Sequence, residues 1–198
     1  MAVTNKQFVA VHREAAFYRR LVPAPNRDHI NTGLTPASHS NMLKKFNGPP
    51  GQKTRNCSQP TNPKVTRLTK TVTITPNLRC TGLKPFLDLI AEVFEEIKGV
   101  YPELYPLITT AGCLCCRLVR KSDFFFSNHS WGTAIDLKIA GILSPQGSGL
   151  IPQGLLTIYP LFYKRKIYWA QGYKKLTDPM HFEASNELIN EWDLKGLI

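Results

Sequence analysis

Apolar residues between positions 84 and 99 recur every three or four residues, which is the spacing of an amphipathic helix. The apolar stripe of this predicted helix consists of Leu87, Ile90, Ala91, Phe94 and Ile97. Gly99 stands where such a helix commonly ends. Two further helices are predicted in the C-terminal part, over residues 154–163 and from a cap at Ser185 to Trp192.

The N-terminal third predicts two shorter helices. Thr4 and Gln7 have the spacing of a capping box, and the helix that they open should end before Pro23. Its apolar positions are Phe8, Val11, Ala15 and Tyr18. A second helix should begin with Thr35 as N-cap and Pro36 at the first helical position, and should run to about Phe46. Residues 47–62 are rich in Gly, Pro, Asn, Gln and Ser and predict a long loop.

Short stretches of alternating or β-branched residues predict strands at 65–75, 107–120, 133–139, 167–170 and 180–184. Residues 140–153, which are rich in Gly, Pro and Ser, predict a loop. Helices and strands alternate without a regular βαβ rhythm. This order favours an α+β fold, with a small antiparallel sheet and flanking helices.

The chain of 198 residues carries a formal net charge of +11, and the charge is unevenly distributed. Residues 1–70 hold 12 Lys and Arg against 2 acidic residues, so +10 of the +11 lies there. Such a segment attracts polyanions such as nucleic acid, anionic lipid or acidic wall polymers, although a solvated basic face explains it equally well. We therefore predict a basic N-terminal extension, 1–62, and a second domain, 63–198.

Two features of the sequence bear on the compartment. No apolar run is long enough to span a membrane, and the first residues lack the continuous apolar region of a secretory signal. The expected site of synthesis is therefore the cytoplasm, with any extracellular action reached by lysis or non-classical delivery.

The five cysteines lack paired zinc-ribbon spacing. In Cys113-Leu114-Cys115-Cys116 they are interpreted as small apolar residues of a buried strand.

Two blocks of polar residues carry the candidate chemistry: Ser127-Asn128-His129-Ser130-Trp131-Gly132-Thr133-Ala134-Ile135-Asp136 and Asp178-Pro179-Met180-His181-Phe182-Glu183. Strand alternation turns Asp136 away from the apolar Ile135, and a turn at Gly132 would bring His129 over Asp136. In the second block, His181 and Glu183 share one face, while Met180 and Phe182 point inward. Asp178 should lie in the turn ahead of this strand.

Two imidazoles, one carboxylate and an open fourth position form the ligand set of a catalytic zinc ion. A free carboxylate nearby is the group that such a site needs as a proton acceptor. A single His or Asp on a strand is usually only hydrogen-bonded or solvated. The spacing and facing of the two blocks together predict a metallohydrolase.

The pattern Ser-x-His-x-x-Gly-x-Ala-x-Asp followed by Asp-x-x-His-Phe-Glu resembles the D-alanyl-D-alanine carboxypeptidase and L-alanyl-D-glutamate endopeptidase family of zinc peptidases, of the VanY and phage-endolysin type. The resemblance covers roughly residues 65–192 and leaves the basic N-terminal third unmatched. It implies a Hedgehog/D-Ala-D-Ala peptidase-like fold with one zinc ion per chain. The implied zinc ligands are His129, Asp136 and His181.

The same resemblance implies the other roles. Asp178 corresponds to the general base, and an upstream arginine polarises the scissile carbonyl. Arg117 is the better match for that arginine, with Arg120 close enough to remain an alternative. Ser127 and Trp169 are further candidates for substrate binding, although Ser127 could equally be a turn hydroxyl.

The implied function is zinc-dependent hydrolysis of a peptide bond in the peptidoglycan stem peptide, as a carboxypeptidase or an endopeptidase, in an endolysin or a delivered effector. The expected partners are the stem peptide and an anionic wall polymer. Two alternatives come from another class. One is a non-catalytic, zinc-containing wall-binding module. The other is a nucleic-acid-binding protein that uses the basic segment, which the scarcity of interleaved aromatic residues disfavours.

Overall fold

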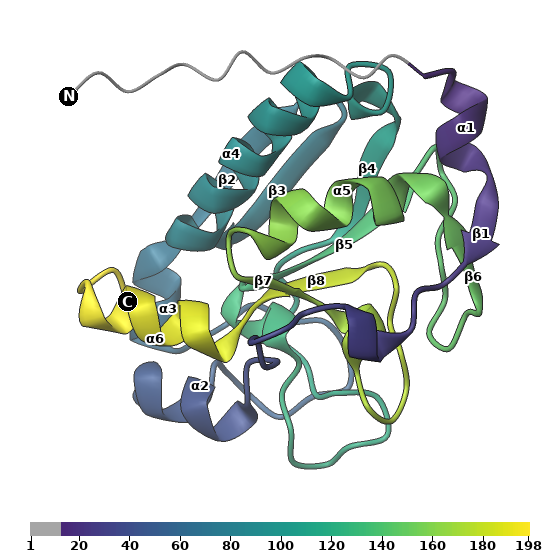
Figure 1. Cartoon of the computed structure of the whole chain (residues 1–198). Coiled ribbons are helices and arrows are strands. Elements are labelled where there is room, and N and C mark those ends of the chain that lie inside the picture. Colours follow the sequence, from purple (N-terminus) through teal and green to yellow (C-terminus); the bar gives the residue numbers. More distant parts are fainter. Residues whose placement is uncertain (1–12) are drawn as a thin grey trace.

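The computed structural model of this chain describes residues 13–198 (Figure 1). Most of the helix expected after Thr4 lies outside the described residues. The described part contains the short helix α1, Ala15–Arg19. Residues 13–198 form an α+β structure with small antiparallel sheets, as the order of elements in the sequence predicted.

The central sheet has four strands in the order β4-β5-β8-β7, and every neighbouring pair is antiparallel. Its strands are β4 (Ile108–Gly112), β5 (Ala134–Ile139), β8 (His181–Ala184) and β7 (Ile167–Trp169). Two small sheets flank it. They pair β1 (Leu21–Pro23) with β6 (Leu150–Pro152), and β2 (Thr69–Thr75) with β3 (Leu78–Leu83).

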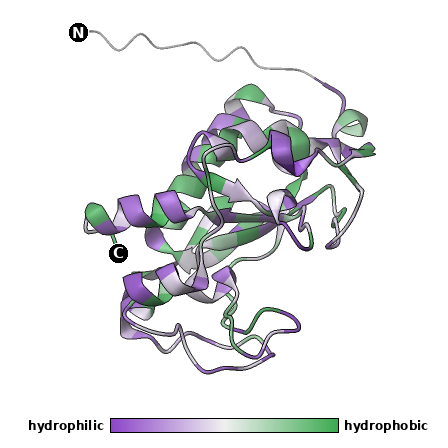
Figure 2. Cartoon of the chain, turned by 60° about the horizontal axis from the view of Figure 1, so that its bottom comes forward, coloured by the Kyte–Doolittle hydropathy of each residue, from purple (hydrophilic) through white to green (hydrophobic). Residues whose placement is uncertain are grey.

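Helix α5 (Gln153–Tyr163) covers one face of the central sheet, and α4 (Lys84–Val100) packs beside α5 and against the β2–β3 hairpin, while α2 (His39–Lys45) and α6 (Asn186–Leu194) lie together near the other face (Figure 1). Phe162 of α5 stacks on Phe182 of β8, with ring centroids 4.5 Å apart. The central strands are largely apolar, whereas the outer sides of the helices are polar (Figure 2). The core therefore lies between the α4–α5 layer and the sheet.

Short 3-10 helices connect several elements: η1 (Arg27–His29), η2 (Tyr105–Leu107), η3 (Asn128–Trp131) and η4 (Ala170–Gly172). Within residues 13–198, no helix is both long and apolar enough to cross a membrane.

The strand predicted over residues 65–75 was wrong in its first half. Residues Pro63–Leu68 form helix α3, and β2 begins only at Thr69. The Asn62 side chain accepts hydrogen bonds from the backbone N–H groups of Lys64 and Val65. This cap, with Pro63 in the first turn, outweighs the β propensity of the residues that follow.

The second N-terminal helix also begins later than predicted. Its N-cap is Ser38 rather than Thr35. Thr35 instead donates from its backbone N–H and its hydroxyl to Glu187 of α6, and Pro36 forms a bridge with Ser185. Tertiary partners from the C-terminal helix thus replace the local capping that the sequence suggested.

Two further expectations needed correction. The strand predicted over residues 107–120 ends at Gly112, and the chain beyond it bonds to residues 54–58 instead of continuing the sheet. The predicted loop 140–153 contains β6, because the N-terminal strand β1 supplies its pairing partner.

The N-terminal segment shares the core of the rest of the chain. Tyr18, Met42 and Phe46 are all fully buried, with α1 against α5 and α2 against α6. The division into domains at residue 62 therefore stays a prediction, and the packing argues that residues 13–62 and 63–198 depend on each other.

A truncated chain that starts at Pro63 should be unfolded or insoluble. Removal of a large buried side chain costs about 2–5 kcal/mol. The loss of Tyr18, Met42 and Phe46 together approaches the total stability of a typical domain, about 5–15 kcal/mol. Circular dichroism and thermal melting of the truncated and full-length chains test this. A truncated chain with a cooperative melt near that of the full-length protein would contradict it.

Candidate metal centre

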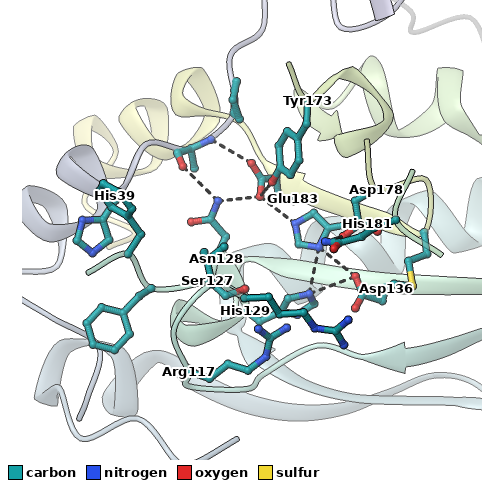
Figure 3. A pocket seen from close by; sticks show the side chains of 18 residues that line it. His39, Arg117, Ser127, Asn128, His129, Asp136, Tyr173, Asp178, His181 and Glu183 are labelled. Atoms are coloured by element: carbon teal, nitrogen blue, oxygen red, sulfur yellow. Dashed lines mark hydrogen bonds and ion pairs between the residues drawn. The ribbon is translucent and has the colours of Figure 1, made fainter. Parts of the chain in front are cut away.

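Three side chains from three elements converge on one point beside the central sheet (Figure 3). His129 comes from η3, Asp136 from β5 and His181 from β8. Asp136 and His181 are direct partners in the β5–β8 register, so they project from the same face of the sheet. That face is opposite the one covered by α5, to which Ile135 and Phe182 turn.

Gly132 makes the third ligand position reachable. It adopts φ +67° at the end of η3, where the chain turns into β5. A Cβ atom at this position would lie 2.6 Å from the backbone nitrogen of Leu83, which donates a hydrogen bond to the Gly132 carbonyl. Only glycine fits this turn, and the turn returns His129 over Asp136, as the sequence predicted.

The outer nitrogen of each imidazole is engaged by an oxygen atom. His129 Nδ1 lies 2.5 Å from the Cys113 carbonyl oxygen, and His181 Nε2 lies 2.9 Å from the Glu183 carboxylate. Both contacts favour the tautomer that carries the proton on the outer nitrogen. His129 Nε2 and His181 Nδ1 then direct lone pairs toward each other and toward Asp136.

The distances between these inner atoms suit a small cation. His129 Nε2 and His181 Nδ1 are 3.1 Å apart, and they lie 3.2 Å and 3.0 Å from Asp136 Oδ1. Tetrahedral zinc with bonds of 2.0–2.1 Å separates its ligand atoms by about 3.3 Å. Three electron-rich atoms this close repel one another unless a cation lies between them, so the donor set fits zinc.

In the absence of a metal ion, bound protons must reduce the repulsion between these three inner atoms. Burial disfavours a charged His181, but hydrogen bonds to Asp136 and Glu183 outweigh this and raise its pKa to about 10. Burial likewise opposes ionisation of Asp136, yet the two imidazoles hold the pKa of this carboxyl well below its usual range. The pair therefore favours an ionised carboxylate beside a positive charge, which is the arrangement that a metal ion also satisfies.

Glu183 supports the centre from behind His181. Its side chain is fully buried, and one oxygen accepts from His181 Nε2, from the Tyr173 hydroxyl at 2.7 Å and from Asn128 Nδ2 at 2.7 Å. The other oxygen accepts from the backbone N–H of Ala37 at 3.2 Å. Burial, followed by the charge of Glu183, raises the pKa of Tyr173 well above its usual value and keeps it a donor.

A cavity of about 460 Å³ opens beside these residues. Asp178 lies on its wall, largely buried, and its Oδ2 accepts a hydrogen bond from Gln146 at 2.8 Å. Its buried Oδ1 has no hydrogen-bond partner among the described residues. Burial raises the pKa of this carboxyl. A carboxylate with one free oxygen and a raised pKa is suited to accept a proton inside the cavity.

The cavity also receives the two arginines and the serine that the sequence singled out. Arg117, Arg120 and Ser127 all line it. Arg117 is half-buried, and its guanidinium donates to the Leu118 carbonyl at 3.0 Å. Arg120 is exposed. Arg117 is thus the more firmly positioned of the two alternatives.

Trp169 lies elsewhere. It is fully buried, it pairs with Phe182 across β7 and β8, and its ring stacks on that phenylalanine on the face opposite His181. Its Nε1 donates to the Pro179 carbonyl at 2.6 Å. Trp169 therefore supports the turn after Asp178 and does not line the cavity. Met180, expected to point inward, lines the cavity instead.

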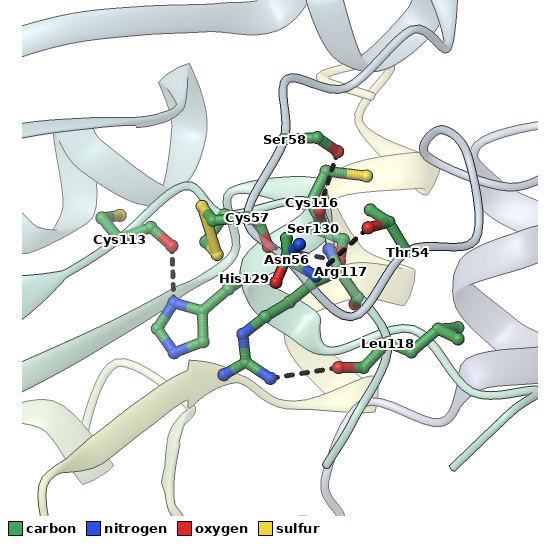
Figure 4. Close-up of a disulfide and its surroundings, with 11 residues drawn as sticks. Thr54, Asn56, Cys57, Ser58, Cys113, Cys116, Arg117, Leu118, His129 and Ser130 are labelled. Carbon is green, nitrogen blue, oxygen red and sulfur yellow. Dashed lines mark hydrogen bonds between the residues drawn. A yellow bond between two sulfur atoms is a disulfide. The ribbon is translucent and has the colours of Figure 1, made fainter. Parts of the chain in front are cut away.

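The cysteine-rich segment differs from the predicted buried strand. Cys115 forms a disulfide with Cys57, while Cys80, Cys113 and Cys116 are buried and free (Figure 4). The disulfide and a set of backbone hydrogen bonds fasten residues 54–58 to residues 115–118. Arg117 emerges from this fastened segment, and its backbone N–H donates to the Ser130 hydroxyl at 3.0 Å.

Several cavity residues were not anticipated. Gln146, which positions Asp178, comes from the Gly- and Pro-rich loop, where no local pattern marks it. His39 and Ala37 come from the N-terminal segment, and Asn128 and Tyr173 contact Glu183. Only Asn128 carried a signal, since it directly precedes His129.

Comparisons with known proteins agree with the motifs. The family model described as D-alanyl-D-alanine carboxypeptidase matches residues 120–184. The matched segment contains His129, Asp136, Asp178 and His181, while Arg117 and the N-terminal segment lie outside it. No curated protein and no solved structure matches the chain. Over residues 120–184, the chain is therefore similar to the D-alanyl-D-alanine carboxypeptidase family of zinc peptidases, which confirms the resemblance inferred from the sequence.

Proposed function

We propose that this protein is a zinc-dependent peptidase that hydrolyses a peptide bond in the stem peptide of peptidoglycan. The observation that carries the proposal is the convergence of His129, Asp136 and His181 in one cavity with Asp178, whose buried Oδ1 has no hydrogen-bond partner among residues 13–198. A bound zinc ion would polarise the scissile carbonyl and lower the pKa of water to about 7.

The side chains of this cavity would supply the remaining steps. Asp178 accepts the proton of the attacking water and later passes it to the leaving amine. The guanidinium of Arg117 offsets the negative charge that grows on the tetrahedral oxygen, which is worth most inside a cavity shielded from water. Ser127 would hydrogen-bond the substrate and Arg120 would attract its carboxylates, and both proposed roles are supported by their position on the cavity wall.

A non-catalytic wall-binding module would use the same fold without needing a proton acceptor. Two properties of Asp178 favour catalysis: its Oδ1 has no hydrogen-bond partner in the described part of the chain, and its pKa is raised. A buried carboxylate costs free energy, and this one is not part of the metal-ligand cluster. Hydrolysis of purified peptidoglycan, followed by mass spectrometry of the released muropeptides, tests the proposal directly and identifies the bond cut. Release of no peptide fragments by the zinc-loaded protein would reject it.

The zinc content of the protein should depend on His129 and His181. His181→Ala should lose nearly all of the one zinc ion per chain, whereas His39→Ala should retain it. His39 lines the same cavity but is not part of the ligand cluster, so it is a matched control. Elemental analysis of both purified variants gives the answer, and full zinc occupancy in His181→Ala would show that the ligand set is wrong.

Asp178→Asn should separate catalysis from metal binding. The amide has the size of the carboxylate but cannot accept the proton, so turnover should fall on the order of a hundredfold or more. Zinc content and melting temperature should stay close to those of the wild type. Asp28→Asn, at an exposed position, serves as control and should keep full activity. Near-normal turnover in Asp178→Asn would assign the base to another group.

Glu183→Gln should weaken zinc binding, because a neutral amide makes His181 a poorer ligand. Loss of such an outer hydrogen-bond partner typically costs about 10–100-fold in metal affinity. Competition with a chelator measures that affinity, and thermal melting of the metal-free protein measures the structural effect separately. A lower melting temperature with unchanged zinc affinity would mean that Glu183 acts only in folding.

A further inference from the structure

A second cavity of about 310 Å³ adjoins the metal cavity. It is lined by Arg55, Arg117, Leu118, Val119, Arg120 and Lys121. Three of these residues, Arg117, Val119 and Arg120, also line the metal cavity. The two cavities therefore share a wall and lie side by side.

The charge of this second cavity is positive and poorly compensated. Four of its six lining residues are cations. Arg55 forms an ion pair with Asp123 at 2.5 Å, but within residues 13–198 no ion pair joins Arg117, Arg120 or Lys121 to a carboxylate. Clustered like charges repel one another, so a bound anion would relieve a cost that the free protein carries.

The cations are held in place by two structural devices. Arg120 and Lys121 occupy the tip of a turn closed by a hydrogen bond from Ser122 to the Val119 carbonyl. Lys121 adopts φ +64°, a conformation that glycine or asparagine adopts at lower cost. The turn thus places the side chains of Arg120 and Lys121 next to each other at the cavity.

The second device holds Arg55, which lies outside the segment that the family model matches. The Cys57–Cys115 disulfide fixes its loop (Figure 4). A hydrogen bond from the backbone N–H of Leu118 to the Thr54 carbonyl, at 2.8 Å, fixes the same loop beside Arg117. The N-terminal segment thus places the Arg55 guanidinium in the cavity that adjoins the metal cavity.

We propose that Arg55, Arg120 and Lys121 form a subsite for a carboxylate of the substrate peptide, at a position away from the scissile bond. This inference rests on the proposed peptidase function. Guanidinium groups bind carboxylates through paired, charge-assisted hydrogen bonds. The shared wall with the metal cavity favours an anion that belongs to the substrate itself over a separate one.

The test uses a set of stem peptides that differ only in which carboxylate is free and which is converted to an amide. With the wild-type enzyme, amidation of one carboxylate should raise KM about tenfold, the size of one lost charge-assisted hydrogen bond. The value of kcat should stay the same, because the contact lies away from the reacting atoms. The double variant Arg55→Gln/Lys121→Gly should show the same KM for both peptides.

Arg79→Gln is the matched control, since Arg79 is exposed on β3 and lines neither cavity. It should retain the wild-type preference for the free carboxylate. Lys121→Gly alone should melt at the same or a higher temperature while its KM for the free acid rises. That combination separates a binding role from a structural one.

Equal KM values for every amidated peptide with the wild type would overturn the subsite, even if inorganic phosphate inhibits competitively. Phosphate inhibition with no peptide preference would assign the cavity to a separate phosphate anion. If the wild type cleaves none of the peptides, the proposed function fails. Calorimetric binding of the free and amidated peptides to the zinc-loaded protein then still decides the subsite: a preference for the free acid upholds it, and equal affinity overturns it.

Discussion

Asp136 and His181 oppose each other in the antiparallel pairing of β5 with β8, and this register determines almost everything around the centre. Strand side chains alternate between faces, so a slip of one residue would bring Ile135 or Phe182 to the site and turn the ligands into the core. The packing of Phe182 against Phe162 and Trp169 opposes such a slip. The packing on the apolar face of the sheet thus fixes the strand register, and with it the positions of Asp136 and His181 on the polar face.

Glu183 connects the β5–β8 pair to the N-terminal segment through hydrogen bonds. A buried carboxylate is tolerated only when its oxygens are hydrogen-bonded, and Glu183 meets this with four donors from separate parts of the chain. One donor is the backbone of Ala37, which also accepts a hydrogen bond from Asn128. The N-terminal segment therefore completes the surroundings of His181 as well as the core, although it lies outside the matched family segment.

The sequence predicted the parts of the site that depend on local pattern. Alternation along β5 and β8 and the need for glycine at position 132 were enough to bring His129, Asp136 and His181 together. Elements that depend on distant partners were not predictable in this way. Helix α2 begins at His39 because Glu187 and Ser185 bind the preceding residues, and Gln146 reaches Asp178 from a loop without periodicity. Asn62 was a local signal that the strand-like residues after it obscured.

The features that lower the folding stability of this molecule are concentrated on one face. Asp178 buries an oxygen that has no hydrogen-bond partner within residues 13–198, two imidazoles direct lone pairs at a carboxylate, and Lys121 holds a left-handed conformation in a cavity lined by three arginines. Each of these lowers the stability of the free protein, and none of them is needed to pack the core. A bound cation relieves the first cluster, and an anion relieves the second. The two cavities share Arg117, so the charges that each ligand compensates lie side by side. With a cation bound, a peptide whose scissile carbonyl lay at that cation and whose carboxylate lay at the basic cavity would contact both clusters, and this is the substrate selection that the proposed function and the proposed subsite together predict.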